Sequence, residues 1–177
     1  MPRSMVRILG VCGSLQQRSA NLDLLRAAVA LAPDGVELTV GDLLRAVAHF
    51  DPDLEPAPEL PAVAAWRRAI AASDALLVAC PEYGFSLPGS LKNGIDWVIG
   101  SAELERKVVA ITASVVHPDR GRKGLGALRQ TLEAVSAVIV GGAPITRGPE
   151  RDGQLVTLIA AVVAAVEAQR AARAKDG

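Results

Sequence analysis

The feature that most constrains the fold is an alternation of short apolar strands with longer helical patterns. Segments rich in β-branched residues recur at 6–12, 36–40, 75–80, 107–113 and 137–141. Apolar residues at helical spacing occupy 21–32, 60–73, 88–100, 124–135 and 155–166. Strands that alternate with helices predict a parallel sheet with right-handed crossovers and helices on both faces, which is a three-layer α/β fold.

The length of 177 residues predicts a single domain over 1–177, and no internal repeat or interdomain linker interrupts it. Half of the residues are hydrophobic but only 3% are aromatic, so the core must consist of Ala, Val, Leu and Ile. The Pro-rich acidic segment 51–61 is interpreted as a surface loop. The polar tail after Gln169 is expected to fray.

Charge and cysteine content exclude several classes of protein. The formal net charge is zero, which gives no electrostatic reason to expect nucleic acid or an anionic membrane as a partner. Cys12 and Cys80 form no disulfide framework and are too few for a zinc site. The N-terminal apolar stretch is typical of a strand rather than a signal peptide, and the apolar run 155–165 is shorter than the about 20 residues that cross a bilayer. We therefore expect a cytoplasmic protein with no metal.

A polar loop over residues 13–21 follows the first strand and leads into the first helix. A helix N-terminus offers unpaired N–H groups and partial positive charge, which favour a phosphate. Ser14, Ser19 and Asn21 add short polar side chains, and Arg18 adds a full charge. Neither Gly-x-Gly-x-x-Gly nor Gly-Lys-Ser/Thr is present, which argues against a dinucleotide-binding or NTPase loop. The alternative is that Ser19 or Asn21 only caps the helix.

The run Pro81–Trp97 is rich in Pro and Gly and carries three of the five aromatic residues. It follows the strand predicted at 75–80, at the strand end where open α/β sheets bind ligands. Contact with a planar ligand or burial between subunits would explain Tyr83 and Phe85 in such a loop. We interpret Leu91, Ile95 and Trp97 as a helix face that packs on the sheet or lies at an interface.

These two loops resemble the NAD(P)H-dependent FMN reductases, a family that includes quinone and chromate reductases. The resemblance extends over residues 5–142. It implies a flavodoxin-like doubly wound sheet of order 2-1-3-4-5, with FMN and NAD(P)H as cofactors. It also implies hydride transfer from nicotinamide to flavin, and then reduction of a small-molecule acceptor: a quinone, free flavin, azo compound or metal oxyanion.

In this family the first loop, Gly-Ser-x-Arg-x-x-Ser-x-Asn, grips the FMN 5′-phosphate, which implies that role for Ser14, Ser19 and Asn21. Gln16 stands where the family has Arg. Either Arg18 replaces the missing charge, or neutral donors hold the phosphate.

The second loop of the family, Pro-Glu-Tyr-Asn, wraps the isoalloxazine ring largely through backbone groups. The matching residues are Pro81, Glu82, Tyr83 and Gly84. Gly84 replaces the usual Asn, a mild exchange because glycine allows positive φ and close approach of a ring.

A third loop follows the strand predicted at 107–113. Ser114 matches the family residue at the far edge of the flavin, but 115–124 is longer and more basic than the usual Gly-rich loop. This loop is a candidate to meet the NADPH phosphate, or else a solvated charge cluster. His117 is a candidate proton donor. Because the cofactor carries the chemistry, we name no catalytic residue.

Relatives place the helix predicted at 88–100 in a dimer interface, which implies a homodimer or homotetramer. Two other classes remain open. Cys12 and Arg18 fit the Cys-x5-Arg-Ser motif of low-molecular-weight tyrosine phosphatases, with a thiolate nucleophile. Those enzymes need a late Asp-Pro pair, whereas Asp51-Pro52 comes early. The other class is a flavin electron carrier without turnover, which zero net charge disfavours because carriers tend to be acidic.

Overall fold

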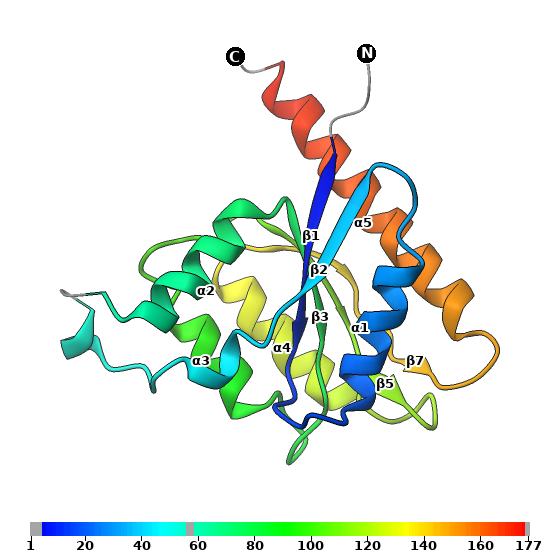
Figure 1. The fold of residues 1–177 in the computed structure, drawn as a ribbon, viewed down its shortest axis with the longest axis horizontal. Coiled ribbons are helices and arrows are strands. Elements are labelled where there is room, and N and C mark those ends of the chain that lie inside the picture. The colour runs from blue at the N-terminus through cyan, green and yellow to red at the C-terminus, as the bar shows by residue number, and fades with distance from the viewer. Residues whose placement is uncertain (1–4, 56–58, 176–177) are drawn as a thin grey trace.

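The computed structural model describes residues 5–55 and 59–175, and its centre is a five-stranded parallel sheet (Figure 1). The strand order is β2-β1-β3-β4-β6. Because β6 is the fifth long strand along the chain, this confirms the flavodoxin-like order 2-1-3-4-5. The strands are β1 (Val6–Cys12), β2 (Val36–Val40), β3 (Ala75–Ala79), β4 (Val108–Thr112) and β6 (Val138–Gly141).

Helices cover both faces of the sheet, as the alternation predicts (Figure 1). One face packs against α1 (Ala20–Ala30) and α5 (Arg151–Arg173). The other packs against α2 (Pro61–Ala72), α3 (Gly89–Asp96) and α4 (Arg122–Ala134). The short 3-10 helices η1 (Leu44–Ala46) and η2 (Pro52–Leu54) lie between β2 and α2.

The two central strands are apolar throughout because both of their faces are buried. Every residue of β3 and β4 is buried. Along β3, Leu76 and Val78 belong to the core beside α2, α3 and α4, whereas Leu77 belongs to the core beside α1 and α5. The alternation of side chains along a strand therefore supplies both cores from one apolar run.

The structure adds one element that the sequence pattern does not predict. Strands β5 (Ser114–Val115) and β7 (Ile145–Thr146) form a separate two-stranded parallel sheet. Ser114 pairs with Ile145, and Val115 pairs with Thr146. These strands follow β4 and β6 directly, so they extend the C-terminal side of the main sheet where its loops lie.

Several helix boundaries differ from the prediction. α3 ends at Asp96, and turns follow over residues 97–101. The helix is therefore shorter than the range 88–100 that the sequence predicts. α4 begins at Arg122, two residues before the predicted start. α5 continues past Gln169 to Arg173, so the prediction of a frayed tail is wrong for these residues. Part of the predicted surface loop 51–61, residues 56–58, lies outside the described residues.

Among the described residues, α5 is the one helix that has the length and apolar composition to cross a membrane, a test that core helices of soluble proteins also pass. Its buried residues recur at helical spacing and belong to the core beside α1: Leu155, Ile159, Val162 and Val166. The apolar stripe therefore has a packing role in this fold.

Candidate functional site

The loops after β1, β3 and β4 enclose a pocket of about 380 Å³ at the C-terminal edge of the sheet, a size that suits a small-molecule ligand. It lies where the strand order reverses between β1 and β3. Residues that the sequence places in the site form much of its lining: Ser14, Gln16, Ser19, Asn21, Pro81, Glu82, Tyr83 and Ser114. The exposed Arg18 and the turn residue Gly84 lie outside this lining.

The first loop is held at both ends by hydrogen bonds. At the end of β1, the amide of Gly13 donates to the carbonyl oxygen of Ala79 at 2.9 Å. Ser14 Oγ accepts from the Gln16 amide at 3.2 Å. Ser19 is the N-cap of α1, and its Oγ accepts from the Asn21 amide at 3.2 Å. The capping role of Ser19 is thus confirmed, and the same residue lines the pocket.

Asn21 connects the first loop to the third. Its side chain is buried, and Oδ1 accepts from the backbone amide of Ser114 at 2.9 Å. An amide donor requires an oxygen acceptor, which fixes the orientation of the Asn21 side chain. Nδ2 is then the side-chain atom that is left for a ligand, and Ser114 is held at the pocket by its backbone.

The second loop contains a tight turn from Tyr83 to Ser86. The amide of each of these two residues donates to the carbonyl of the other, both at 3.0 Å. Gly84 and Phe85 have φ of +57° and +62°, as a type I′ turn requires. Asn and Gly are the residues that such a turn favours, which explains Gly84 at this position. Phe85 is 68% exposed, and Lys123 Nζ lies 3.7 Å from the centre of its ring.

Two side chains fix the second loop relative to its neighbours. Tyr83 Oη lies 3.3 Å from Ser14 Oγ, which joins the first and second loops across the pocket. Glu82 Oε2 accepts from the Gly124 amide at 2.9 Å, in the first turn of α4, where a carboxylate is favourable. A Cβ at Gly124 would lie 3.0 Å from Cα of Glu82, so glycine allows this close approach.

Arg120 and Arg147 are the two basic residues in the lining of this pocket, and the sequence analysis names neither individually. Arg120 lies in the basic third loop. Arg147 follows β7, and its amide donates to the carbonyl oxygen of Val115 at 2.9 Å. No motif marks Arg147, because the unpredicted pairing of β5 with β7 brings it to the site. His117, the candidate proton donor, lies outside the lining, and its Nδ1 is 3.3 Å from Asp119 Oδ2.

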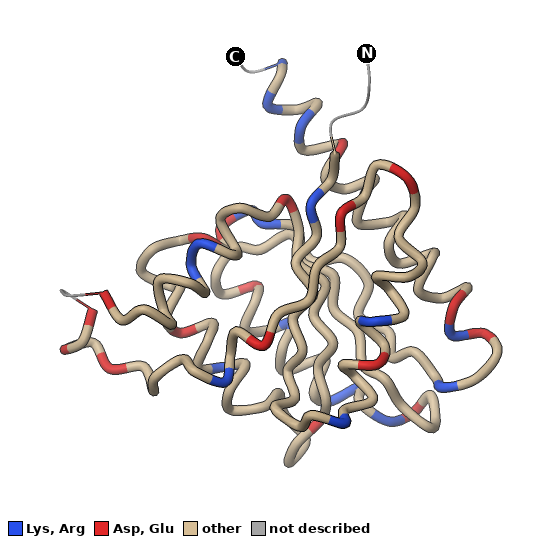
Figure 2. The backbone as a smooth tube through the Cα atoms, viewed as in Figure 1, with Lys and Arg blue, Asp and Glu red and all other residues tan. Residues whose placement is uncertain are grey.

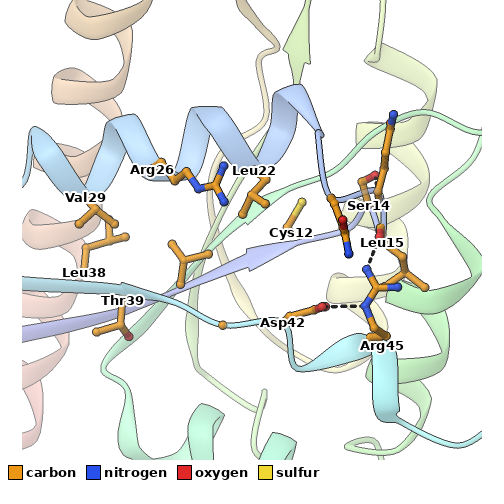
Figure 3. Close-up of a pocket in the computed structure, with 14 residues that line it drawn as sticks. Cys12, Ser14, Leu15, Leu22, Arg26, Val29, Leu38, Thr39, Asp42 and Arg45 are labelled. Atoms are coloured by element: carbon orange, nitrogen blue, oxygen red, sulfur yellow. Dashed lines mark hydrogen bonds and ion pairs between the residues drawn. The ribbon is translucent and has the colours of Figure 1, made fainter.

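A larger hollow of about 790 Å³ lies between α1 and β2 (Figure 3). It includes Cys12, Leu22 and Arg26 but no residue of the second loop, although Ser14 and Gln16 border both hollows. We take the smaller pocket as the candidate site, because the three loops that carry the sequence motifs meet there.

The structure does not assemble a phosphatase site. Cys12 is directed into the hollow between α1 and β2, whereas Arg18 lines neither hollow (Figure 3). Burial raises the pKa of the Cys12 thiol, which opposes formation of the thiolate nucleophile. Asp51 Oδ1 accepts from the Asp53 amide in η2, so the early Asp-Pro pair serves as a helix cap.

Cys12 Sγ donates to Ser19 Oγ at 4.0 Å but does not line the pocket. Replacing Cys12 by serine keeps a donor at this position, so FMN affinity should stay within about twofold of the wild type. Neither protein should hydrolyse an aryl phosphate. Flavin fluorescence titration and a chromogenic phosphate assay measure these two quantities. Aryl phosphate hydrolysis by the wild type that Cys12→Ser abolishes would favour the phosphatase.

The doubly wound sheet and the pocket at its switch point define a flavodoxin-like protein. Solved structures share this fold. The flavoenzyme NAD(P)H:(acceptor) oxidoreductase FerB from Paracoccus denitrificans superposes with a TM-score of 0.79 at 24% identity, covering 92% of this chain and 98% of that one. A flavodoxin, WrbA-like protein from Agrobacterium tumefaciens superposes with a TM-score of 0.62 at 14% identity, covering 93% and 99%.

Within this class, the chain belongs to the NADPH-dependent FMN reductase family, whose model matches residues 6–148. It is 36% identical over 131 residues to an NAD(P)H-dependent FMN reductase of Pseudomonas aeruginosa, covering 72% of this chain and 69% of that protein. It is 29% identical over 138 residues to a quinone reductase of Escherichia coli, covering 76% and 73%.

Proposed function

We propose that this protein is an NAD(P)H-dependent FMN oxidoreductase that binds FMN in the pocket between the first, second and third loops. The observation that carries the proposal is the meeting of the two family loops, joined by Ser14 and Tyr83 at 3.3 Å. Membership of the family supports the same activity. The protein passes electrons to a small molecule, with a quinone as the favoured acceptor because similar proteins are quinone reductases.

The residues of the pocket fit FMN by their donor set. The N-terminus of α1, capped by Ser19, provides amide groups and partial positive charge that suit the phosphate. Tyr83 and the backbone of Pro81 and Glu82 provide an apolar ring and polar main-chain groups that suit the flavin ring system. When bound, FMN supplies the hydride transfer from the nicotinamide to the acceptor.

The protein residues bind and orient rather than react in this proposal. Glu82 is occupied by the Gly124 amide, so its carboxylate holds the second loop in place. Burial raises the pKa of Cys80 to about 12, so this thiol, like Cys12, stays protonated at neutral pH. No side chain is assigned the role of acid or base.

The subunit arrangement and the compartment are part of the proposal. Tyr83 and Val116 line the pocket and are 53% and 72% exposed, and Phe85, in the same turn as Tyr83, is 68% exposed. The exposure of these side chains in the single chain supports a homodimer or homotetramer in which a second copy covers them, with flavin sites at the interface. Sedimentation equilibrium measures the mass directly, and a monomer would contradict this part. We also propose a cytoplasmic location, because the N-terminal apolar stretch is typical of a strand and not of a signal peptide.

An anaerobic reduction experiment tests the activity. Protein reconstituted with FMN should lose its visible flavin absorbance when NADPH or NADH is added, and a quinone should restore it. The order of additions separates reduction from reoxidation. A flavin that NAD(P)H reduces only when a second protein is added would favour the electron carrier. If the bound FMN stays oxidised after NADPH, NADH and a second protein are each added, the proposal is wrong.

A further inference from the structure

The first loop brings no positive side chain into the pocket. Gln16, which stands where relatives carry arginine, lines the pocket, whereas the exposed Arg18 does not. The helix N-terminus contributes only a partial charge. A phosphate monoester carries nearly two negative charges at neutral pH. The loop that the family uses for the phosphate therefore leaves a deficit of positive charge in this chain.

Two arginines from other segments of the chain line the same pocket. Arg120 comes from the third loop and Arg147 from the end of β7. In Figure 2, basic segments lie along the lower edge of the molecule, next to the loops at the C-terminal ends of the strands. Neither guanidinium forms a hydrogen bond or an ion pair with another described residue. By contrast, Arg122 donates to the carbonyl of Pro118, and Arg129 to the carbonyl of Gly141.

The position of Arg147 is coupled to the first loop through the small sheet. Asn21, in the first turn of α1, holds the amide of Ser114. Ser114 pairs with Ile145, and the amide of Arg147 donates to the carbonyl of Val115. The backbone that carries Arg147 is thus fixed relative to the N-terminus of α1. The side chains of Arg120 and Arg147 are exposed, as that of Arg18 is, but unlike Arg18 they line the pocket. Unpaired guanidinium groups in the same pocket as a helix N-terminus are suited to bind a phosphate, since arginine can donate two parallel hydrogen bonds to its oxygens.

We propose that Arg147, assisted by Arg120, binds the 5′-phosphate of FMN in place of the first-loop arginine of relatives. The proposal rests on the proposed function, because it assigns the phosphate of the same cofactor. The chemistry recognised is a phosphate monoester, which NADPH also carries at its 2′ position. The N-terminus of α1 in the same pocket favours the FMN phosphate, and the experiment separates the two sources.

The test compares FMN with riboflavin, which has the same ring system without the phosphate. Arg147→Gln should weaken FMN binding about 10- to 100-fold, the effect of losing hydrogen bonds to a charged group. Riboflavin binding should change less than about threefold. Arg120→Gln should act in the same direction. Arg18→Gln is the matched control, since it removes the same charge from the first loop outside the pocket, and both affinities should remain near wild type. Fluorescence quenching gives the dissociation constants, and thermal melting confirms that each variant folds.

Three results would overturn the assignment. Arg147→Gln could weaken the binding of FMN and of riboflavin equally, which would indicate altered packing instead of lost phosphate binding. Arg18→Gln could match Arg147→Gln, which would indicate long-range charge alone. The preference for NADPH over NADH could fall while FMN binding is retained, which would assign the arginines to the nicotinamide cofactor. A wild-type protein that binds neither flavin would instead contradict the proposed function itself, so the two failures differ.

Discussion

Replacing Ser19 by aspartate should abolish FMN binding at micromolar concentrations and leave the fold intact. Aspartate is as good an N-cap as serine, so its carboxylate can accept from the Asn21 amide as Ser19 Oγ does. The new charge would stand in the pocket at a position that is only 3% exposed, where solvent screens it poorly. Juxtaposed like charges cost several kcal/mol, which corresponds to a rise of about 100-fold or more in the dissociation constant for FMN.

Fluorescence titration with FMN and with riboflavin measures this effect, because riboflavin lacks the phosphate that aspartate repels. Ser19→Asn is the matched control, since asparagine also caps helices but adds no charge. Its FMN affinity should stay close to wild type, and all three proteins should melt at similar temperatures. If Ser19→Asp binds FMN as tightly as the wild type, the phosphate does not lie at the N-terminus of α1.

Replacing Trp97 by alanine should lower the free energy of unfolding by about 3–5 kcal/mol, the usual loss for a buried tryptophan. Trp97 is 1% exposed in the single chain, so it belongs to the core, where the sequence interpretation allowed an interface as well. Its Nε1 donates to the carbonyl oxygen of Ala48 at 2.7 Å. The ring of Phe50 meets it edge-on, with centroids 5.2 Å apart. The substitution therefore leaves a cavity and removes two contacts to the segment between β2 and α2, which Asn93 still holds by hydrogen bonds to Ala48 and Phe50.

Urea unfolding at a fixed protein concentration measures this loss. Trp97→Phe retains most of the ring volume but removes the N–H donor. The Ala48 carbonyl keeps its hydrogen bond from Asn93 Nδ2 at 2.8 Å, so we expect a smaller loss of about 0.5–1.5 kcal/mol, the net contribution of one hydrogen bond. A change below about 1 kcal/mol in Trp97→Ala, which is typical of surface positions, would contradict the core assignment.

The strands were the most predictable part of the fold. The predicted segments 6–12 and 36–40 coincide with β1 and β2, because β-branched residues bounded by polar turns identify a strand. The pair β5 and β7 was not predictable from periodicity, since two residues show no period. The end of α5 differs from the prediction for another reason: the polarity of the tail after Gln169 predicts fraying, whereas Arg and Ala are strong helix formers and α5 extends to Arg173.

The candidate site was predictable where a motif is local in the chain. Ser14, Ser19 and Tyr83 lie in short loops after buried strands, and the structure gathers them in one pocket. The roles of these residues in binding remain predictions. Arg147 was not accessible to this reasoning, because only the tertiary pairing of β7 with β5 places it there. For Arg18 the sequence predicts its place in the first loop, but it does not predict the direction in which a long exposed side chain points.

The most direct test of the central claim is the location of FMN, measured from backbone amide chemical shifts during an NMR titration of the apoprotein. We expect the largest shifts in residues 13–21, in 81–86 and around Ser114, with saturation at one FMN per chain. The larger hollow between α1 and β2 provides the internal comparison. Shifts concentrated at Leu22, Arg26 and residues 38–42, with little change in the second loop, would contradict the account.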